Sequence, residues 1–209
     1  EELDRVIPII EAIRSSLDVC ISIDTSSPLV MAQATQSGAE LINDVRALAA
    51  PGAMELAVTS GAAVCLMHMQ GKHSSMQKNV SDASYSNGNV VEEVFEFLQG
   101  RVKHCLAQGM ERSRLLVDPG FGFGKTVQHN YVLLRRLSHF SRLEMPVLVG
   151  VSRKSMIGEA TGRAVDQRLA GSIAATAYAL ASGAKIIRTH DVAATMDAIR
   201  VTCAYSSAE

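Results

Sequence analysis

Short, continuous runs of apolar residues recur six times along the chain. Continuous runs are typical of strands covered on both faces, as in a parallel sheet, because strands with one solvated face alternate instead. The pattern therefore predicts six parallel strands, at VCISID (19–24), AELIND (39–44), AVCLMHM (63–69), RLLVDP (114–119), PVLVGVS (146–152) and AKIIRTH (184–190).

Helical patterns lie between these runs, with apolar residues three or four positions apart. In the first pattern, Pro8 predicts a kink or a late helix start. Two others have a proline near the start and a glycine after the end, namely Pro28 with Gly38 and Pro51 with Gly61. The predicted helices cover residues 3–17, 26–38, 50–61, 90–109, 130–140, 166–183 and 191–205.

The alternation of strand and helix predicts right-handed βαβ units, in either an open doubly wound sheet or a (β/α)8 barrel. Six units are two short of a barrel, and complete barrels have about 250 residues. The sequence of 209 residues starts in mid-helix, so a barrel without its N-terminal portion and a six-stranded sheet are both compatible with it. We expect a single domain over residues 1–209.

One long segment, residues 70–89, is polar and has no periodicity. Because it follows the third strand, it predicts either a mobile active-site loop or a disordered insertion. Its Asn79-Val-Ser triplet matches a glycosylation acceptor, which a cytosolic protein would not use.

The composition argues against several classes of partner. With 20 basic and 21 acidic residues, the formal net charge is −1, so we expect no nucleic-acid partner. The sequence has no run of 18 apolar residues and no signal-peptide pattern, so we expect no membrane partner. The four cysteines are scattered, which favours reduced thiols and a cytoplasmic location.

Polar side chains follow the predicted strands at their C-terminal ends, where parallel α/β folds carry their active sites. Some of them have simpler explanations. Asp24 and Asp191 each precede a helix and are candidates for its cap. Asp118 precedes a proline and fits an Asx turn, and His68 fits an ordinary core histidine. The full set is Asp24, Asn43, Asp44, His68, Asp118, Ser152, Arg153, Lys154, Arg188 and His190.

The stretch LLVDPGFGFGKT contains the parts of a phosphate-binding loop, but its spacing does not fit that role. A Walker loop has four residues between its first glycine and Gly-Lys, whereas Gly120 and Gly124 leave three. Asp118 would also direct a carboxylate toward the phosphates. We predict instead that Asp118 accepts two hydrogen bonds from the amino edge of a flat heterocycle, with Phe121 and Phe123 as apolar walls.

Positive charge is concentrated after the last two predicted strands, in SRKS (152–155) and RTHD (188–191). If these are the final strands of a barrel, they lie where such barrels commonly bind phosphate. Ser155 starts the next helix, and the helix N-terminus would also favour an anion. For Arg153, a solvated surface charge is an equally good explanation.

The motifs SIDTSSP, INDV, CLMHMQG, LLVDPGFGFGK, LVGVSRKSMIG and IIRTHDV resemble, in order and context, those of bacterial dihydropteroate synthases. The resemblance to this pterin-binding family covers essentially all 209 residues. The combination of DPGFGFGK with SRKS is its most specific part, because related pterin-binding methyltransferases share the barrel and some of the acids but not SRKS.

The resemblance implies a (β/α)8 barrel, of which this chain supplies about six βα units, and a homodimer. It also implies a sulfonamide-targeted transferase of folate biosynthesis. Such an enzyme condenses 6-hydroxymethyl-7,8-dihydropterin pyrophosphate with para-aminobenzoate and releases pyrophosphate. The competing hypotheses are a pterin-binding methyltransferase that uses methyltetrahydrofolate and an inactive chain that only binds pterin or a partner.

Residue roles follow from the same resemblance, motif by motif. The implied catalytic residues are Asp118, Lys154 and Asp24. The implied pterin-binding residues are Asp24, Asn43, Met69, Asp118, Lys154 and Arg188. The implied para-aminobenzoate-binding residues are Phe121, Lys154 and Ser155, and those for pyrophosphate are Arg188 and His190.

The resemblance implies Mg²⁺ as a cofactor. In the family, the residue near the magnesium lies in N-terminal strands and loops that this sequence lacks, so we expect no metal ligand within the 209 residues. A barrel without those strands would also expose a sheet edge. We therefore expect this chain, if produced alone, to be poorly soluble or inactive.

Overall fold

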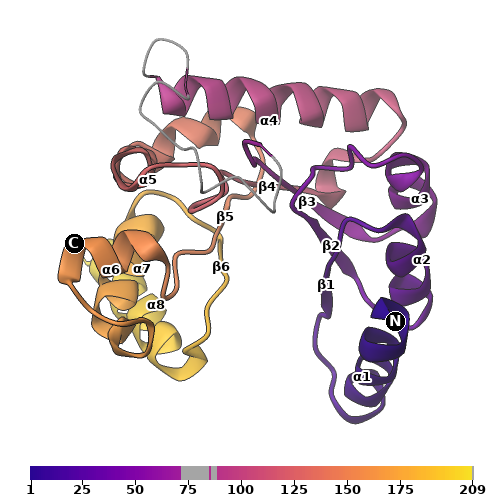
Figure 1. The fold of residues 1–209 in the computed structure, drawn as a ribbon, viewed down its shortest axis with the longest axis horizontal. Coiled ribbons are helices and arrows are strands. Elements are labelled where there is room, and N and C mark those ends of the chain that lie inside the picture. The colour runs from indigo at the N-terminus through magenta and orange to yellow at the C-terminus, as the bar shows by residue number, and fades with distance from the viewer. Residues whose placement is uncertain (72–84, 86–88, 209) are drawn as a thin grey trace. The chain divides into compact units, whose positions relative to one another are not determined.

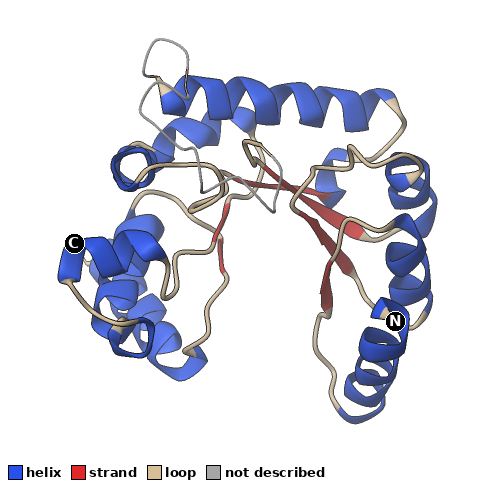
Figure 2. Ribbon diagram, in the orientation of Figure 1, coloured by secondary structure: helices blue, strands red, loops and turns tan. Residues whose placement is uncertain are grey.

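The computed structural model describes residues 1–71, 85 and 89–208, which fall into two compact units (Figure 1). The first unit comprises residues 1–68 and 98–117, and the second comprises residues 69–97 and 118–209. Strands and helices alternate along the described chain, as the sequence predicts (Figure 2). The predicted loop or insertion at 70–89, including Asn79, lies almost entirely outside the described residues.

All six predicted strands are present, and each is shorter than its apolar run. In the first unit, four strands form one sheet in the order β1-β2-β3-β4, and both β1–β2 and β2–β3 are parallel pairs. In the second unit, β5 and β6 form a parallel pair. The strands are β1 (Ser22–Asp24), β2 (Leu41–Asp44), β3 (Ala63–Met67), β4 (Leu115–Asp118), β5 (Leu148–Val149) and β6 (Ile186–Ile187).

Burial of the strands explains why their sequences do not alternate. In β2, β3 and β4 almost every residue is buried, so both faces need apolar side chains. Strand β1 differs, because only Ile23 is buried and its neighbours Ser22 and Asp24 are exposed. The continuous-run rule therefore holds for β2, β3 and β4 and fails for β1, at one edge of the sheet.

Seven of the described helices correspond to the predicted helical ranges, with changes at their ends, whereas α6 lies in none of those ranges and only its start at Ser155 was expected. They are α1 (Glu2–Ser16), α2 (Pro28–Gln36), α3 (Ala53–Ser60), α4 (Val90–Ala107), α5 (Val127–Arg135), α6 (Ser155–Thr161), α7 (Leu169–Ala181) and α8 (Val192–Ser206). Helix α1 starts before Pro8, so the late start allowed by the sequence is wrong. Helix α2 starts at Pro28, as predicted, whereas α3 starts two residues after Pro51.

In the first unit, α1 packs on α2 and α2 packs on α3 (Figure 1). Helix α2 has no charged residue, and α3 has one, Glu55.

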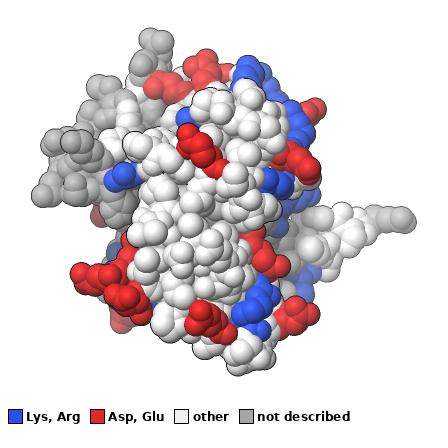
Figure 3. Space-filling model, turned by 90° about the vertical axis from the view of Figure 1, so that its right-hand side faces the viewer, with Lys and Arg blue, Asp and Glu red and all other residues white. Residues whose placement is uncertain are grey.

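On the face shown in Figure 3, basic and acidic side chains are interspersed, and neither sign forms a continuous patch. Within the described residues, no helix is both long and apolar enough to cross a membrane.

In the second unit, α5, α6 and α7 pack on one another, and α7 packs on α8. The pairing of β5 with β6 places Leu148 opposite Ile186 and Val149 opposite Ile187. Because the two strands are parallel, the segments after them, which contain SRKS and RTHD, leave the sheet at the same edge. This arrangement agrees with the sequence-based expectation that the two basic segments lie together.

Arg114 fastens the end of α3 to the start of β4 within the first unit. Its Nε and Nη2 donate to the carbonyl of Ala62 at 3.0 and 2.7 Å. Its remaining bonds go to the carbonyls of Ala57 at 2.6 Å and Val58 at 3.2 Å, in the last turn of α3. These carbonyls belong to a helix end and the loop after it, where the regular backbone bonds of a helix stop; the Ala57 carbonyl also accepts from Ser60 Oγ at 3.1 Å.

We predict that Arg114→Ala lowers the free energy of unfolding by about 2 to 3 kcal/mol, because several carbonyls lose a charged donor. Chemical denaturation monitored by circular dichroism measures this change. Arg5→Ala, at an exposed position of α1, is the control and should change the same quantity by less than about 0.5 kcal/mol. Equal effects of the two substitutions would contradict the assigned role of Arg114.

Candidate active site

Asp118 ends β4 and is 7% exposed, although its side chain is acidic. Its Oδ1 accepts a hydrogen bond from the backbone N–H of Gly120 at 2.7 Å, which is the Asx-turn contact considered from the sequence. Burial raises the pKa of the Asp118 carboxyl above its ordinary value, and Lys154, the Gly120 N–H, Lys125 and Arg188 oppose the rise. Asp118 therefore has a local structural role and also lies among three cationic side chains.

The loop after Asp118 is held from inside by Lys125. The Lys125 side chain is 2% exposed, and its Nζ donates to the carbonyls of Gly120 at 2.8 Å and Phe123 at 3.1 Å. Burial, which outweighs the attraction of Asp118, lowers the pKa of Lys125 to about 7. The lysine that makes this stretch look like a Walker motif therefore points into its own loop and organises it.

A second polar group, Asn130 on α5, holds the same loop from the helix. Its Oδ1 accepts from the Gly122 N–H at 2.7 Å, and its Nδ2 donates to the Thr126 carbonyl at 2.7 Å. Helix α5 starts with a capping box between Thr126 and His129, which stabilises the first turn of the helix that carries Asn130. Neither Lys125 nor Asn130 was among the predicted site residues.

Two glycines of the loop are needed for different reasons. Gly122 has φ +78°, and a Cβ there would lie 3.2 Å from Cδ of Lys154. Gly124 has φ +66°, and a Cβ there would overlap the carbonyl of Gln70. The first glycine leaves space for a functional side chain, and the second allows two backbone segments to approach.

Lys154 lies against the loop that Asp118 begins. Its Nζ donates to the Phe121 carbonyl and lies 4.8 Å from the centre of the Phe123 ring. Burial is the main reason why the pKa of Lys154 falls to about 8; Asp118 opposes this shift and Arg188 adds to it. Lys154, Asp118 and Phe121 are therefore brought together in the second unit, as expected for one site.

The two phenylalanines of the loop differ in exposure. The Phe121 side chain is fully buried, at 0% exposure, whereas Phe123 is partly exposed and faces the ammonium of Lys154. Phe121 as a wall for para-aminobenzoate stays a prediction. In this structure Phe123 is the ring that lies beside the lysine and retains accessible surface.

Asp24 and Asn43 form a second group of predicted residues, in the first unit. They lie opposite each other in the parallel pairing of β1 with β2. Asn43 is 7% exposed, and its Oδ1 is buried without a hydrogen-bond partner among the described residues. A buried amide oxygen that lacks a donor is costly unless a ligand or water supplies one.

His68 and Met69 follow β3. His68 is 6% exposed, as expected for either a core histidine or the wall of a closed site. Met69 is half-buried. Its proposed contact with pterin stays a prediction.

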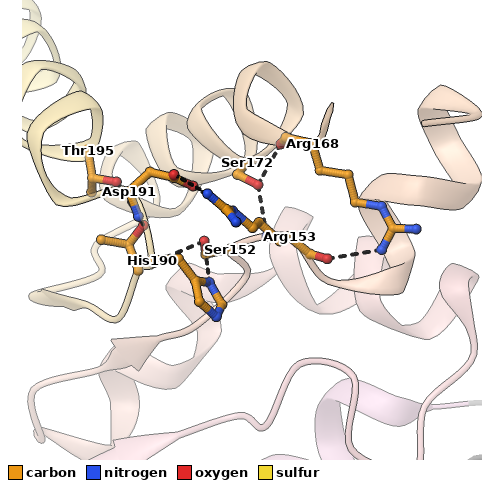
Figure 4. Close-up of polar contacts among 8 residues, drawn as sticks. Ser152, Arg153, Arg168, Ser172, His190, Asp191 and Thr195 are labelled. Atoms are coloured by element: carbon orange, nitrogen blue, oxygen red, sulfur yellow. Dashed lines mark hydrogen bonds and ion pairs between the residues drawn. The ribbon is translucent and has the colours of Figure 1, made fainter. Parts of the chain in front are cut away.

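The two basic segments contact each other through Ser152 and His190 (Figure 4). The His190 backbone N–H donates to Ser152 Oγ at 3.2 Å, and the His190 Nδ1 lies 2.9 Å from the same oxygen. The backbone N–H of Arg188 donates to the Val149 carbonyl at 2.9 Å, and its side chain is exposed. Ser155 is exposed at the start of α6, directly after Lys154.

Two alternatives based on helix capping prove wrong. Helix α2 has Ser27, not Asp24, at its N-cap. Asp191 does occupy the N-cap position of α8, but its side chain makes no capping hydrogen bond. Its carboxylate instead pairs with the guanidinium of Arg153, so the alternative of a purely solvated Arg153 is wrong as well.

The described residues contain no group of three or more histidine, cysteine, aspartate or glutamate side chains that could hold a metal ion. Oxygen ligands are what Mg²⁺ prefers, usually one or two carboxylates together with substrate phosphates.

Comparison with known proteins identifies the family. A family model described as "pterin binding enzyme" matches residues 1–190. The dihydropteroate synthase of Haemophilus influenzae is 50% identical over 208 residues, which cover 100% of this chain and 74% of that protein. The chain belongs to the dihydropteroate synthase family.

Solved structures of the family agree. The Yersinia pestis dihydropteroate synthase in a sulfonamide drug complex is 44% identical, with a TM-score of 0.94 over 100% of this chain and 74% of that one. The Xanthomonas albilineans enzyme in complex with 7,8-dihydropteroate is 44% identical, with a TM-score of 0.91 over 100% of this chain and 77% of that one. The predicted family, transferase function and (β/α)8-barrel fold class are therefore confirmed.

The lowered pKa of Lys154 predicts a pH dependence. Above its value of about 8 the ammonium loses its proton, so the charge near Asp118 disappears. We expect kcat/KM for dihydropteroate formation to fall on an alkaline limb near this pH, and Lys154→Arg should move the limb upward because arginine stays protonated. A pH–rate profile measures both.

The exposed Lys103 on α4 provides the matched control, and Lys103→Arg should leave the limb in place. An alkaline limb that does not move in the Lys154→Arg enzyme would assign the titration to another group.

Proposed function

We propose that this chain carries the pterin- and para-aminobenzoate-binding residues of a dihydropteroate synthase, and that Asp118 and Lys154 are the centre of its site. The observation that carries the proposal is the buried Asp118 carboxyl at a strand end, with Lys154, Lys125 and Arg188 as its electrostatic neighbours. A buried carboxyl with several cations around it matches a site for a polar, flat ligand better than it matches a structural core.

The pterin ring would bind through hydrogen bonds from its amino-pyrimidine edge to Asp118. Asn43 and Asp24, which pair in the sheet of the first unit, stay predicted pterin ligands on the strength of the family motifs. Within that unit, the buried Oδ1 of Asn43 can accept a hydrogen bond from a ring N–H. Met69 would pack on the ring, and Arg188 would stack over it.

The aminobenzoate would bind beside Lys154. The carbonyl of Phe121 already accepts from Lys154, so Phe121 would act through its backbone as well as its ring. Phe123, which faces the same ammonium, is the better placed of the two rings to flank an aromatic substrate. Ser155 and the N-terminus of α6 would meet the carboxylate.

In the reaction, the bond between the methylene carbon and the pyrophosphate oxygen breaks, and a bond forms between that carbon and the aniline nitrogen, which releases one proton to water. Arg188 and His190 would stabilise the negative charge on the departing pyrophosphate. Asp118 would stabilise the positive charge that develops on the pterin ring; for Asp24, in the first unit, the same role stays a prediction from the family motifs. No covalent intermediate with the protein is required.

Mg²⁺ remains a proposed cofactor, and it would offset charge on the pyrophosphate when bound. A homodimer is proposed from the family resemblance alone. A cytoplasmic location is proposed from the scattered, free cysteines.

The central test is Asp118→Asn in the full-length enzyme. We expect the free energy of pterin binding to become less favourable by about 2 to 5 kcal/mol. The reason is that the amide of asparagine replaces one of the two acceptor oxygens of the carboxylate with a donor, in a desolvated site. Calorimetry with the pterin substrate measures the change. Asp18→Asn, at an exposed position, is the control and should bind pterin normally.

Two results would argue against the proposal. Pterin affinity in the Asp118→Asn enzyme equal to that of the wild type would remove Asp118 from the site. A wild-type enzyme that binds pterin but neither binds para-aminobenzoate nor is inhibited by a sulfonamide would instead favour the methyltransferase hypothesis.

A further inference from the structure

Arg153 has an unusual backbone conformation between two residues of the site, Ser152 and Lys154. Its φ is +55°, in the left-handed region that residues other than glycine rarely adopt. The Lys154 N–H donates to the Val151 carbonyl at 3.2 Å, so Arg153 lies within a tight turn. Such a conformation persists only when the surrounding contacts hold it in place.

The backbone of Arg153 is held on both sides by the start of α7 (Figure 4). Its N–H donates to Ser172 Oγ at 2.9 Å, and its carbonyl accepts from Arg168 Nη1 at 3.0 Å. Ser172, which is 3% exposed, in turn donates to the Arg168 carbonyl at 2.7 Å. The Arg168 guanidinium lies so close to Gly158 of α6 that a Cβ there has no room.

The Arg153 side chain reaches from this turn to the segment after β6. Its Nε donates to Asp191 Oδ2 at 3.0 Å, and its Nη2 donates to Asp191 Oδ1, so the pair is bidentate. The Asp191 N–H donates to Thr189 Oγ1 at 3.2 Å, and Thr195 of α8 donates to the same oxygen at 2.9 Å. Arg153 keeps the pKa of the Asp191 carboxyl below its usual range, so the pair stays ionised in mildly acidic solution.

Next to this ion pair, Ser152 and His190 make the two contacts described above. Ser152 Oγ accepts from the His190 N–H, which leaves its single proton available for the His190 Nδ1. In that arrangement the ring proton lies on Nε2, which is then a donor directed away from Ser152. The Arg153–Asp191 pair links the same two loops as the contacts of this ring.

We propose that Arg153 and Asp191 are positioning residues that clasp the 152–155 loop to the 189–191 loop and so orient His190 toward pyrophosphate. The Arg153 charge is neutralised by Asp191 and does not itself bind the anion. This inference rests on the proposed function, since it takes His190 as a pyrophosphate ligand. It adds two residues that would act without touching substrate.

The test is Asp191→Asn, which keeps the size of the side chain and removes the charged, bidentate acceptor. Calorimetry with inorganic pyrophosphate should show a dissociation constant raised by about 10-fold or more, because a small displacement of a binding group has a large cost. The KM for the pterin pyrophosphate should rise with it. The dissociation constant for a pterin without pyrophosphate and the KM for para-aminobenzoate should change by less than about two-fold.

A double-mutant cycle separates this clasp from general stability. Arg153→Ala and Asp191→Ala should each weaken pyrophosphate binding, and the double variant should be no weaker than either, because all three lack the same pair. Arg153→Lys retains the positive charge but cannot make the bidentate contact of a guanidinium. Its pyrophosphate affinity should therefore lie between those of Arg153→Ala and the wild type. Asp197→Asn is the control, since it removes an exposed ion pair with Arg200 on the same helix.

Several outcomes would overturn the proposal. The first three are an unchanged pyrophosphate affinity in Asp191→Asn, additive losses in the double-mutant cycle, and no pyrophosphate binding by the wild type. The fourth is that Asp191→Asn weakens the binding of pterin and of pyrophosphate equally and lowers the melting temperature, which would indicate a structural role. Failure of the proposed function is distinct, because the wild-type enzyme would then not form dihydropteroate. If the wild type forms dihydropteroate and Asp191→Asn leaves the pyrophosphate affinity unchanged, only the positioning role of Arg153 and Asp191 is contradicted.

Discussion

The buried carboxyl of Asp118 is the constraint on which the second unit of this chain depends. A carboxyl in that environment is costly unless charged and polar groups face it, and they do so here from several segments. The Gly120 N–H comes from its own loop, Lys125 comes from the end of that loop, and Lys154 comes from the segment after β5. Placing these groups fixes the path of the backbone between β4 and α5.

Burial shifts the pKa values of these groups away from their charged forms. The pKa of Asp118 is raised while those of Lys154 and Lys125 are lowered, so burial outweighs the mutual attraction in every case. A ligand that offers ring N–H donors to the carboxyl would lower the energy of its charged form.

Much of the architecture could be predicted from the sequence because burial on both faces demands apolar residues regardless of their exact partners. All six strands and most helices were placed in this way, and the glycine spacing ruled out a Walker loop. The errors have local causes. Pro8 is accommodated inside α1, and α3 starts after Gly52 in the left-handed conformation rather than at Pro51. Periodicity does not encode such choices at helix ends.

For the candidate site, too, some features follow from the sequence and others only from the fold. The residue types at strand ends, and the motifs that match dihydropteroate synthases, are properties of the sequence alone and were enough to name Asp118, Lys154, Arg188 and His190. The sequence could not show that Lys125 turns into its own loop, that Phe123 rather than Phe121 keeps accessible surface, or that Asp191 pairs with Arg153 instead of capping α8. Each of these depends on which side chain a neighbouring segment brings within reach. That distance exists only after the chain has folded, so tertiary structure decided it.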